Sequence, residues 1–431
     1  LASGASQTGF GRTGTVDWIT TPKTTSFTAD TGDGYFVNTT SGAITVTLPA
    51  GSANAIVSLA DYAATWQTNA LTVSPNGTDK IGSVNASVTL STEGQSVTFV
   101  YVDSTQGWIN TMDSTSNVRA ISFLTATGGT ITTSGNCKIH TFTGPGTFTV
   151  TETSSTSAEN VVSHLVLAGG AGGAGNQGSW GGGGGGAGGY REVKSPLTPY
   201  TASPLDGYPN SPNRVTVTAT AYPITVGAGG SAGAGCGVGS CGAGGDGNNS
   251  IFSTITSTGG GGGGAGWPES RPACAAAGRP GGSGGGATAP YLGGAGGPAA
   301  CGGSGNTPPV SPSQGNPGGS ALIHPPTRVG GGGGGACAAG GPNNGPGGNG
   351  VATSITGSSV TRGGGGGVGG VSPSSFSPGG TGGGGAGSND SSPGTAGTTN
   401  TGGGGGGSGP GSSPTGGAGG SGIVVIRYKF Q

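Results

Sequence analysis

Glycine dominates the last two thirds of this chain. Of its 108 glycines, 17 precede residue 151 and the other 91 lie beyond it, where they recur as short homopolymer runs. The runs keep no strict Gly-X-Y register, which argues against a collagen triple helix. Polyproline II geometry has about three residues per turn and no internal hydrogen bonds, so neighbouring copies can bond to one another only where glycine lets the backbones touch. The sequence therefore predicts a bundle of polyglycine II helices in which glycine is the core residue.

Charged side chains are scarce. They make up 7% of the residues and the net charge is −1, so the electrostatic footprint of a nucleic-acid or anionic-membrane binder is missing, and we expect no nucleic-acid partner. No apolar run is long enough to span a bilayer and no basic-then-apolar leader opens the chain, so we expect neither a membrane span nor an intact signal peptide. Because the chain starts at Leu1 rather than at a methionine, we expect residues before it to have been removed or to be missing from this sequence.

Period-two alternation of apolar and polar residues covers positions 16 to 111, as in Ile44–Leu48 and Val97–Tyr101, with turn signals such as Asn76-Gly77 between the segments. A second group of expected strands lies at 129–133, 138–143, 147–151 and 161–167, and the chain closes on the apolar segment 423–428. This much glycine, proline and serine is also typical of disorder, but the strands that bracket the glycine region favour an ordered fold.

The predicted fold is therefore all-β: an N-terminal β-sandwich-like module, then a small β-sheet and a glycine-rich polyglycine II helix bundle with long loops. We place the β-rich module at 1–116, a linker at 117–126 and the glycine-rich domain at 127–431, where strands at 129–167, 190–226 and 423–430 frame the runs 168–422. Because the segment 161–167 leads straight into the first run and 423–428 straight out of the last, we expect both in one sheet at a single end of the bundle.

Short loops join antiparallel neighbours, so the runs starting at Ala168, Gly181, Gly227, Gly242, Gly259 and Gly281 should alternate in direction. The intervening loops then sort onto two ends. The end near the sheet receives 190–226, 251–257 and 351–362. The far end receives 176–180, 236–241, 267–280, 371–378 and 412–415. If the segments 318–319 and 340–350 each cross the bundle once, as one pass from end to end, Cys301 and Cys337 also lie at the far end.

Six cysteines allow two interpretations. Cys137 lies in a predicted strand, whereas five lie in loops assigned to the far end: Cys236, Cys241, Cys274, Cys301 and Cys337. Disulfides among these five would stiffen loops that no core can hold, if the protein matures in an oxidising medium. The alternative is that they are small buried residues that stay as thiols. No Cys-x-x-Cys pair and no nearby histidine supports zinc, so we expect no metal.

Catalytic signatures are missing. Matches to Gly-x-Gly-x-x-Gly are expected by chance in glycine homopolymer, and the strand, helix and acidic residue that a nucleotide site needs are absent. His140, His164 and His324 are far apart in the sequence, and the first two alternate with apolar residues, which is typical of side chains on a strand surface. We therefore expect neither an enzyme nor a cofactor.

Exposed aromatic and charged residues in glycine-bounded loops are the candidates for receptor binding: Trp180, Trp267, Glu269, Arg271 and Phe376. Nothing apolar nearby could bury them, and flat aromatic faces beside amide and hydroxyl groups suit sugar rings or the loops of outer-membrane proteins. Alternatively, Trp180 and Trp267 cap the ends of the glycine bundle and keep water off it.

The segments 34–40, 43–50, 59–62 and 95–102 resemble a module that recurs in tail fibres of tailed phages, notably those that infect cyanobacteria. The stretch from Gly144 through 222–227 to the terminal segment 422–428 is similar to glycine-rich phage fibre domains.

This resemblance implies a virion fibre or distal adhesin on the extracellular particle, with a polyglycine II sandwich as known among such adhesins. The implied partners are a host surface glycan or outer-membrane protein and other virion tail or baseplate proteins. Fibre shafts are commonly trimers, which implies a homotrimer, whereas tip adhesins can be single-copy caps.

Two rival functions remain at this point. A purely structural fibre, capsid-decoration or filament subunit would need no receptor, and the elaborate loops favour an adhesin over it. The composition also resembles some insect-type ice-binding proteins, but those need a flat repetitive face, which the irregular loops and the front β module argue against.

Overall fold

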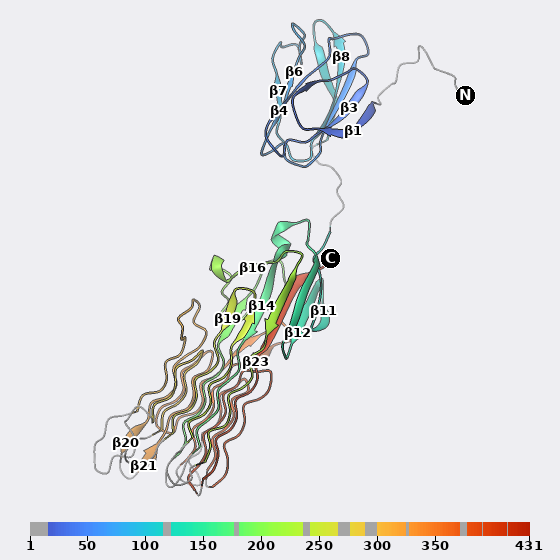
Figure 1. The fold of residues 1–431 in the computed structure, drawn as a ribbon. Helices are drawn as coiled ribbons and strands as arrows, with labels where there is room; N and C mark the ends of the chain where they lie inside the picture. The colour runs from blue at the N-terminus through green and yellow to red at the C-terminus, as the bar shows by residue number, and fades with distance from the viewer. Residues whose placement is uncertain are drawn as a thin grey trace, which may run out of the picture. The chain divides into compact units, whose positions relative to one another are not determined.

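The computed structural model of the chain describes residues 16–114, 122–175, 181–235, 242–265, 276–288, 300–324, 327–370, 377–389, 391–411 and 413–431. The chain divides into two compact units, Leu1–Ala120 and Ile121–Gln431. Both are built from β-strands (Figure 1); within the described ranges the helical turns are η1 (Ser157–Asn160) and η2 (Ser211–Asn213). The predicted all-β class is confirmed.

The first unit consists of two sheets around one core. One sheet has the order β1 (Asp17–Lys23), β3 (Asp33–Val37), β5 (Ile56–Asp61), β8 (Ser96–Asp103) and β9 (Gly107–Ser114). The other has the order β2 (Phe27–Thr28), β4 (Ile44–Thr47), β6 (Leu71–Ser74) and β7 (Val88–Leu90). Up to β6 the chain alternates between the sheets, so successive strands of one sheet run parallel. Their alternate apolar side chains face inward, and Trp66 and Trp108 are fully buried among them.

The second unit begins with two further sheets. One has the order β11 (Thr130–Ser134), β12 (Cys137–Phe142), β24 (Ile423–Lys429), β14 (Val161–Leu167) and β15 (Tyr190–Val193), with β16 (Val215–Thr216) also on β14. The other has the order β10 (Thr125–Thr127), β13 (Gly146–Glu152), β17 (Ala221–Thr225), β18 (Ser250–Phe252) and β19 (Ile255–Ser257). Two separate hairpins join β20 (Leu322–His324) to β21 (Thr327–Val329) and β22 (Val351–Thr353) to β23 (Val360–Arg362).

The last strand closes the second unit. β24 lies between β12 and β14 and pairs antiparallel with both, so the prediction that the segments 161–167 and 423–428 share one sheet is confirmed. Val424 and Ile426 pack into the core shared with the β13 sheet, while Ile423 and Val425 pack on the opposite face. A continuous apolar run is what a strand buried on both faces requires.

The predicted linker 117–126 extends too far. Leu124 and Ala126 are 1% and 4% exposed, and both pack into the core of the second unit beside Phe148. Ala126 belongs to β10, which pairs with β13. β10 is so short that its polar-apolar alternation does not distinguish it from a linker. Pairing with the neighbouring strand β13 makes this segment a regular strand.

The glycine runs extend from these sheets as elongated segments that lie side by side and are not β-strands (Figure 1). Their backbones are joined laterally: in the run 181–189, successive N–H groups donate to three different runs in turn, and the order repeats every three residues. The acceptors are in 402–409, 259–265 and 330–336, and the same run accepts from 168–175, 281–288 and 363–370. This run is therefore surrounded by hydrogen-bonded neighbours, which satisfies backbone groups buried away from water.

The predicted alternation of direction holds for the runs that start at Ala168, Gly181, Gly227, Gly242 and Gly259, but it fails at Gly281. Runs 259–265 and 281–288 are parallel, because the N–H groups of Gly261 and Gly264 donate to Ser283 and Gly286. The reason is an additional pass at 276–280, which was predicted to be part of a loop. This pass lies antiparallel to 281–288.

Candidate functional site

The end of the glycine runs opposite β14 and β24, here called the far end, is the candidate functional site. The runs that end at residues 175, 235, 265, 288 and 370 reach this end, and the runs that begin at 181, 242, 276, 300 and 377 leave from it. The other end, next to the sheets, is called the sheet end. The described ends of several runs thus lie together on one end of a single hydrogen-bonded scaffold.

Small side chains are buried between the runs near the far end. Ala276, Ala287, Ala300 and Ala321 form a buried apolar cluster. The Thr288 hydroxyl accepts a hydrogen bond from the Gly183 N–H at 2.8 Å and donates one to the Gly264 carbonyl. The Thr288 side chain thereby gives hydrogen-bond partners to backbone groups of two other runs, at the point where the neighbouring glycine runs end.

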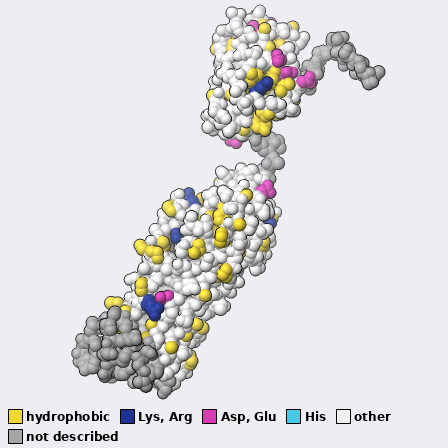
Figure 2. All heavy atoms as spheres, viewed as in Figure 1, with side chains coloured by type: hydrophobic (Ala, Val, Ile, Leu, Met, Phe, Trp, Pro, Cys, Tyr) yellow, Lys and Arg dark blue, Asp and Glu magenta, His cyan; other side chains and the backbone are white. Residues whose placement is uncertain are grey.

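The surface beside this end is poor in charge. In Figure 2 most of the visible described surface of the second unit is backbone and side chains that are neither hydrophobic nor charged, with a few hydrophobic and charged side chains among them. Arg279 and Asp246 form an exposed ion pair at 3.2 Å on the outer runs. A surface of this kind offers hydroxyl, amide and backbone groups for recognition.

The predicted receptor-binding residues Trp180, Trp267, Glu269, Arg271 and Phe376 all lie outside the described residues. Their chain neighbours within the described ranges lie at the far end, as the direction of the runs requires. Whether Trp180 and Trp267 bind a receptor or cap the bundle stays a prediction.

The sequence of the second unit matches a family model described as a glycine-rich domain, over residues 142–429. The chain belongs to this glycine-rich domain family. No curated protein matches the sequence. The matched residues begin at the last residue of β12 and end at the last residue of β24, so the match covers the runs and most strands of the framing sheets, but not β10, β11 and the rest of β12.

Two of the cysteines predicted for the far end lie at opposite ends of the glycine-rich domain, and both are exposed free thiols. Cys301 is at the far end, where its carbonyl accepts from Gly278. Cys337 is at the sheet end, where its N–H donates to Asn349, close to the start of β22. Cys337 was predicted for the far end on the assumption that 340–350 is one pass. The chain makes two passes there, 338–342 and 345–350, so Cys337 lies at the opposite end. Cys236, Cys241 and Cys274 lie outside the described residues.

Two histidines of the glycine-rich domain are buried in its sheets, contrary to the prediction that they lie on a strand surface. His140 bonds to the Gly128 carbonyl at 2.7 Å and the Tyr428 hydroxyl at 3.1 Å, and burial lowers its pKa. Burial, with the charge of Arg191, lowers the pKa of His164 to about 3. The central strands are covered on both faces, which the alternation alone does not reveal. The low pKa of His164 keeps its ring neutral at physiological pH.

No group of three His, Cys, Asp or Glu side chains that could hold a metal occurs in the part of the chain that the structure describes. Across the same residues, no helix has the length and apolar character needed to cross a membrane.

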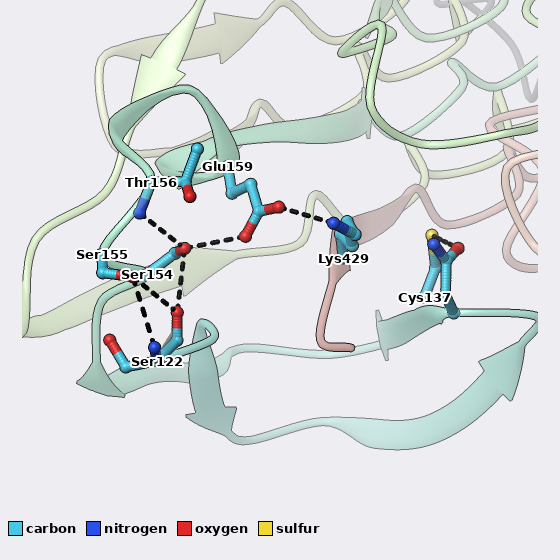
Figure 3. Close-up of polar contacts among 8 residues, drawn as sticks. Ser122, Cys137, Ser154, Ser155, Thr156, Glu159 and Lys429 are labelled. Atoms are coloured by element: carbon cyan, nitrogen blue, oxygen red, sulfur yellow. Dashed lines mark hydrogen bonds and ion pairs between the residues drawn. The ribbon is translucent and has the colours of Figure 1, made fainter. Parts of the chain in front are cut away.

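A polar cluster on the glycine-rich domain joins its last strand to the loop after β13 (Figure 3). The Ser154 hydroxyl donates to one carboxylate oxygen of Glu159 at 2.7 Å, and Lys429 donates to the other at 2.7 Å. Glu159 is 7% exposed. Ser154 and Lys429 together hold the buried carboxylate of Glu159. It fastens β24 to the preceding chain.

This cluster makes the stability of the domain depend on pH. Burial alone would raise the pKa of the Glu159 carboxyl, but the hydrogen bonds from Lys429 and Ser154 and the Lys429 charge outweigh it and lower the pKa. Because the folded pKa lies below that of the unfolded chain, the stabilisation is complete above about pH 5 and is lost as the pH falls through the folded value.

We expect Lys429→Met to lower the free energy of unfolding by about 2 kcal/mol at pH 7, because it leaves a buried carboxylate without its cation. The deficit should shrink toward pH 3, where Glu159 takes up a proton. Denaturant unfolding at both pH values measures this. Lys138→Met is the matched control, since the Lys138 ammonium lies over the Phe430 ring. An equal deficit at both pH values would contradict the prediction.

Sequence reasoning passed over several buried charged residues, among them Glu192, Arg362 and Arg427, which are 2%, 7% and 1% exposed. Arg427 interrupts the otherwise apolar start of β24, and that interruption is a signal that could have found it; Glu192 and Arg362 lie in short strands that contain other polar residues and give no such signal. Arg427 donates to the carbonyls of Pro199 and Ile355 and lies against the Tyr200 ring. These contacts join loops to the sheet.

Proposed function

We propose that this protein is a structural protein of a tailed-phage virion, a tail fibre or distal adhesin, which binds the host cell surface through loops on a polyglycine II scaffold. The observation that carries the proposal is that the ends of many runs lie together on one end of one hydrogen-bonded set of runs. Rigid scaffolds that present adjacent loops are the usual construction of binding surfaces. The resemblance of both units to phage fibre modules supports the same assignment.

The polyglycine II geometry is part of this proposal. The partners of the run 181–189 repeat every three residues, which agrees with the three residues per turn of polyproline II geometry. At the centre of that run, a Cβ on Gly184 would lie 2.1 Å from the Gly366 carbonyl oxygen, so only glycine permits the spacing. Such a scaffold needs no apolar core and can carry loops that change without disturbing it.

The proposed partner is a glycan or an outer-membrane protein of the host, and the domain acts without catalysis. Trp180, Trp267 and Phe376 would supply flat aromatic faces, and Glu269 and Arg271 would supply charged hydrogen-bonding groups. We further propose that the protein assembles with other tail or baseplate proteins in the virion, as a homotrimer if it forms part of a fibre shaft.

The test measures adsorption of the full chain to intact cells of candidate bacterial hosts and its ability to block phage adsorption. We expect Trp267→Ala to weaken binding at least tenfold, since truncated aromatic anchors typically cost about 2 kcal/mol or more. Leu197→Ser is the control, because Leu197 is 39% exposed but follows β15 at the sheet end.

Two outcomes would count against receptor recognition by the far end. One is a well-folded wild-type chain that does not bind host cells, which would favour the purely structural fibre or decoration subunit. The other is binding that Trp180→Ala, Trp267→Ala and Phe376→Ala leave unchanged.

A further inference from the structure

A groove of about 470 Å³ lies on the outer face of the five-stranded sheet in the first unit. Its residues come from both edge strands and from the strands between them. The main lining side chains are Trp18, Ser58, Ser96, Thr98, Met112 and Asp113. The volume lies within the range of small-ligand sites, roughly 300–1,000 Å³.

The shape of the groove follows from the strand register. One row of directly paired residues runs across the sheet: Trp18 of β1, Gly34 of β3, Ser58 of β5, Thr98 of β8 and Met112 of β9. Paired residues point to the same face. The two large side chains stand on the edge strands, and the small ones between them form the floor. This order of large, small and large residues makes a trough along the strands.

The indole of Trp18 is held in place at the edge of the groove. A Cβ on Gly34 would lie 2.8 Å from two indole carbons, so glycine at this position lets the ring approach the sheet. The Phe36 ring packs against it with centroids 4.8 Å apart. Trp18 nevertheless stays 43% exposed. A large aromatic surface is thus exposed to solvent. Because the ring is already held in place, its side chain loses little further conformational entropy when a ligand binds.

Polar groups of the groove are hydroxyls and one carboxylate. The Ser58 and Thr98 hydroxyls bond to each other at 2.7 Å, and Asp113 accepts from the Gln95 amide at 3.0 Å. Hydroxyls both donate and accept hydrogen bonds, and a carboxylate accepts them. No lysine or arginine is among the described residues that line the groove. This chemistry disfavours anionic ligands.

We propose that the groove is a saccharide-binding site for a neutral oligosaccharide, with one sugar ring stacked on Trp18 and its hydroxyls bonded to the floor and to Asp113. The exposed aromatic face, the hydroxyl floor and the absence of a cation among the described lining residues favour a sugar over a phosphate or an acidic peptide. The site lies in the first unit and is separate from the proposed far-end receptor site.

The full chain is tested on an array of neutral and acidic oligosaccharides, and the best neutral binder is then titrated in solution. We expect Trp18→Ala to weaken binding at least tenfold and Trp18→Phe to keep it within about threefold, because phenylalanine still offers a ring face. Tyr62→Ala is the matched control, since Tyr62 is an aromatic residue 50% exposed on the same unit and outside the groove. Trp267→Ala should leave this binding intact, which separates the groove from the far end.

Three results would overturn the proposal. The first is that no neutral oligosaccharide is retained, and the second is that Trp18→Ala binds as well as Tyr62→Ala. The third is that the array stays empty while Trp18→Ala dissociates an oligomer of the wild-type chain, which would assign the groove to a second copy.

Discussion

Gly184→Val is expected to destabilise the glycine-rich domain by at least about 4 kcal/mol, a cost that single substitutions reach only exceptionally. The new Cβ would lie 2.1 Å from the carbonyl oxygen and 2.7 Å from the carbonyl carbon of Gly366, and 3.0 Å from the Gly333 nitrogen. All three are backbone atoms of runs that bond to 181–189. The clash therefore cannot be relieved by a side-chain rotation, and the runs must separate.

Thermal unfolding and resistance to protease measure this effect. Gly144→Val is the matched control, because Gly144 belongs to the same domain and a Cβ there has no atom within 4 Å. We expect the control to melt close to the wild type and Gly184→Val to melt at least about 10 °C lower. A Gly184→Val protein that unfolds like the control would show that the backbones need not touch.

The sequence predicts this scaffold well where the runs are homopolymers and poorly where they are not. The pass 276–280 reads Ala-Ala-Gly-Arg-Pro and contains a single glycine, so its composition resembles a loop. It lies on the outside of the set, where Arg279 extends to solvent and pairs with Asp246. Outer runs tolerate side chains that point away from their neighbours. The density of glycine therefore identifies central runs and misses peripheral ones.

The same limitation explains the misplaced Cys337. Its place was predicted with 340–350 as one pass, and the chain makes two passes there, 338–342 and 345–350, which reverses the end at which Cys337 lies. The strands are easier to predict, because the apolar segments 161–167 and 423–428 join directly to runs and must meet at one end. What covers each face of their sheet depends on loops far away in the sequence, so the burial of His140 and His164 could not be predicted.

The groove at Trp18 was also missed. Trp18 and Gly34 are ordinary members of alternating segments, and only the parallel pairing of β1, β3 and β5 brings them into one row with Ser58. Sequence alternation indicates which residues share a face of one strand. It does not indicate which strands are neighbours, and the groove is a property of neighbours.

Glu192→Ala is expected to lower the free energy of unfolding of the glycine-rich domain by about 3–5 kcal/mol. The Glu192 carboxylate is 2% exposed and accepts hydrogen bonds from the Tyr190 hydroxyl at 2.8 Å, the Ser203 N–H at 3.1 Å and the Thr353 hydroxyl at 2.5 Å. Thr353 lies in β22, so this carboxylate joins two elements that are 161 residues apart. Alanine would leave three buried donors without an acceptor.

Removal of the negative charge of Glu192 destabilises the domain further. Burial lowers the pKa of the Arg362 guanidinium, while the nearby Tyr190 and the negative charge of Glu192 act in the opposite direction. Without Glu192 that cation loses a compensating charge in a site where it is 7% exposed. We expect Glu192→Gln, which keeps an acceptor, to lie between wild type and Glu192→Ala. Denaturant unfolding measures all three, with the exposed Glu152→Ala as control. If Glu192→Ala costs no more than Glu152→Ala, the carboxylate does not hold β15 and β22 together, and the sheet end depends on apolar contacts alone.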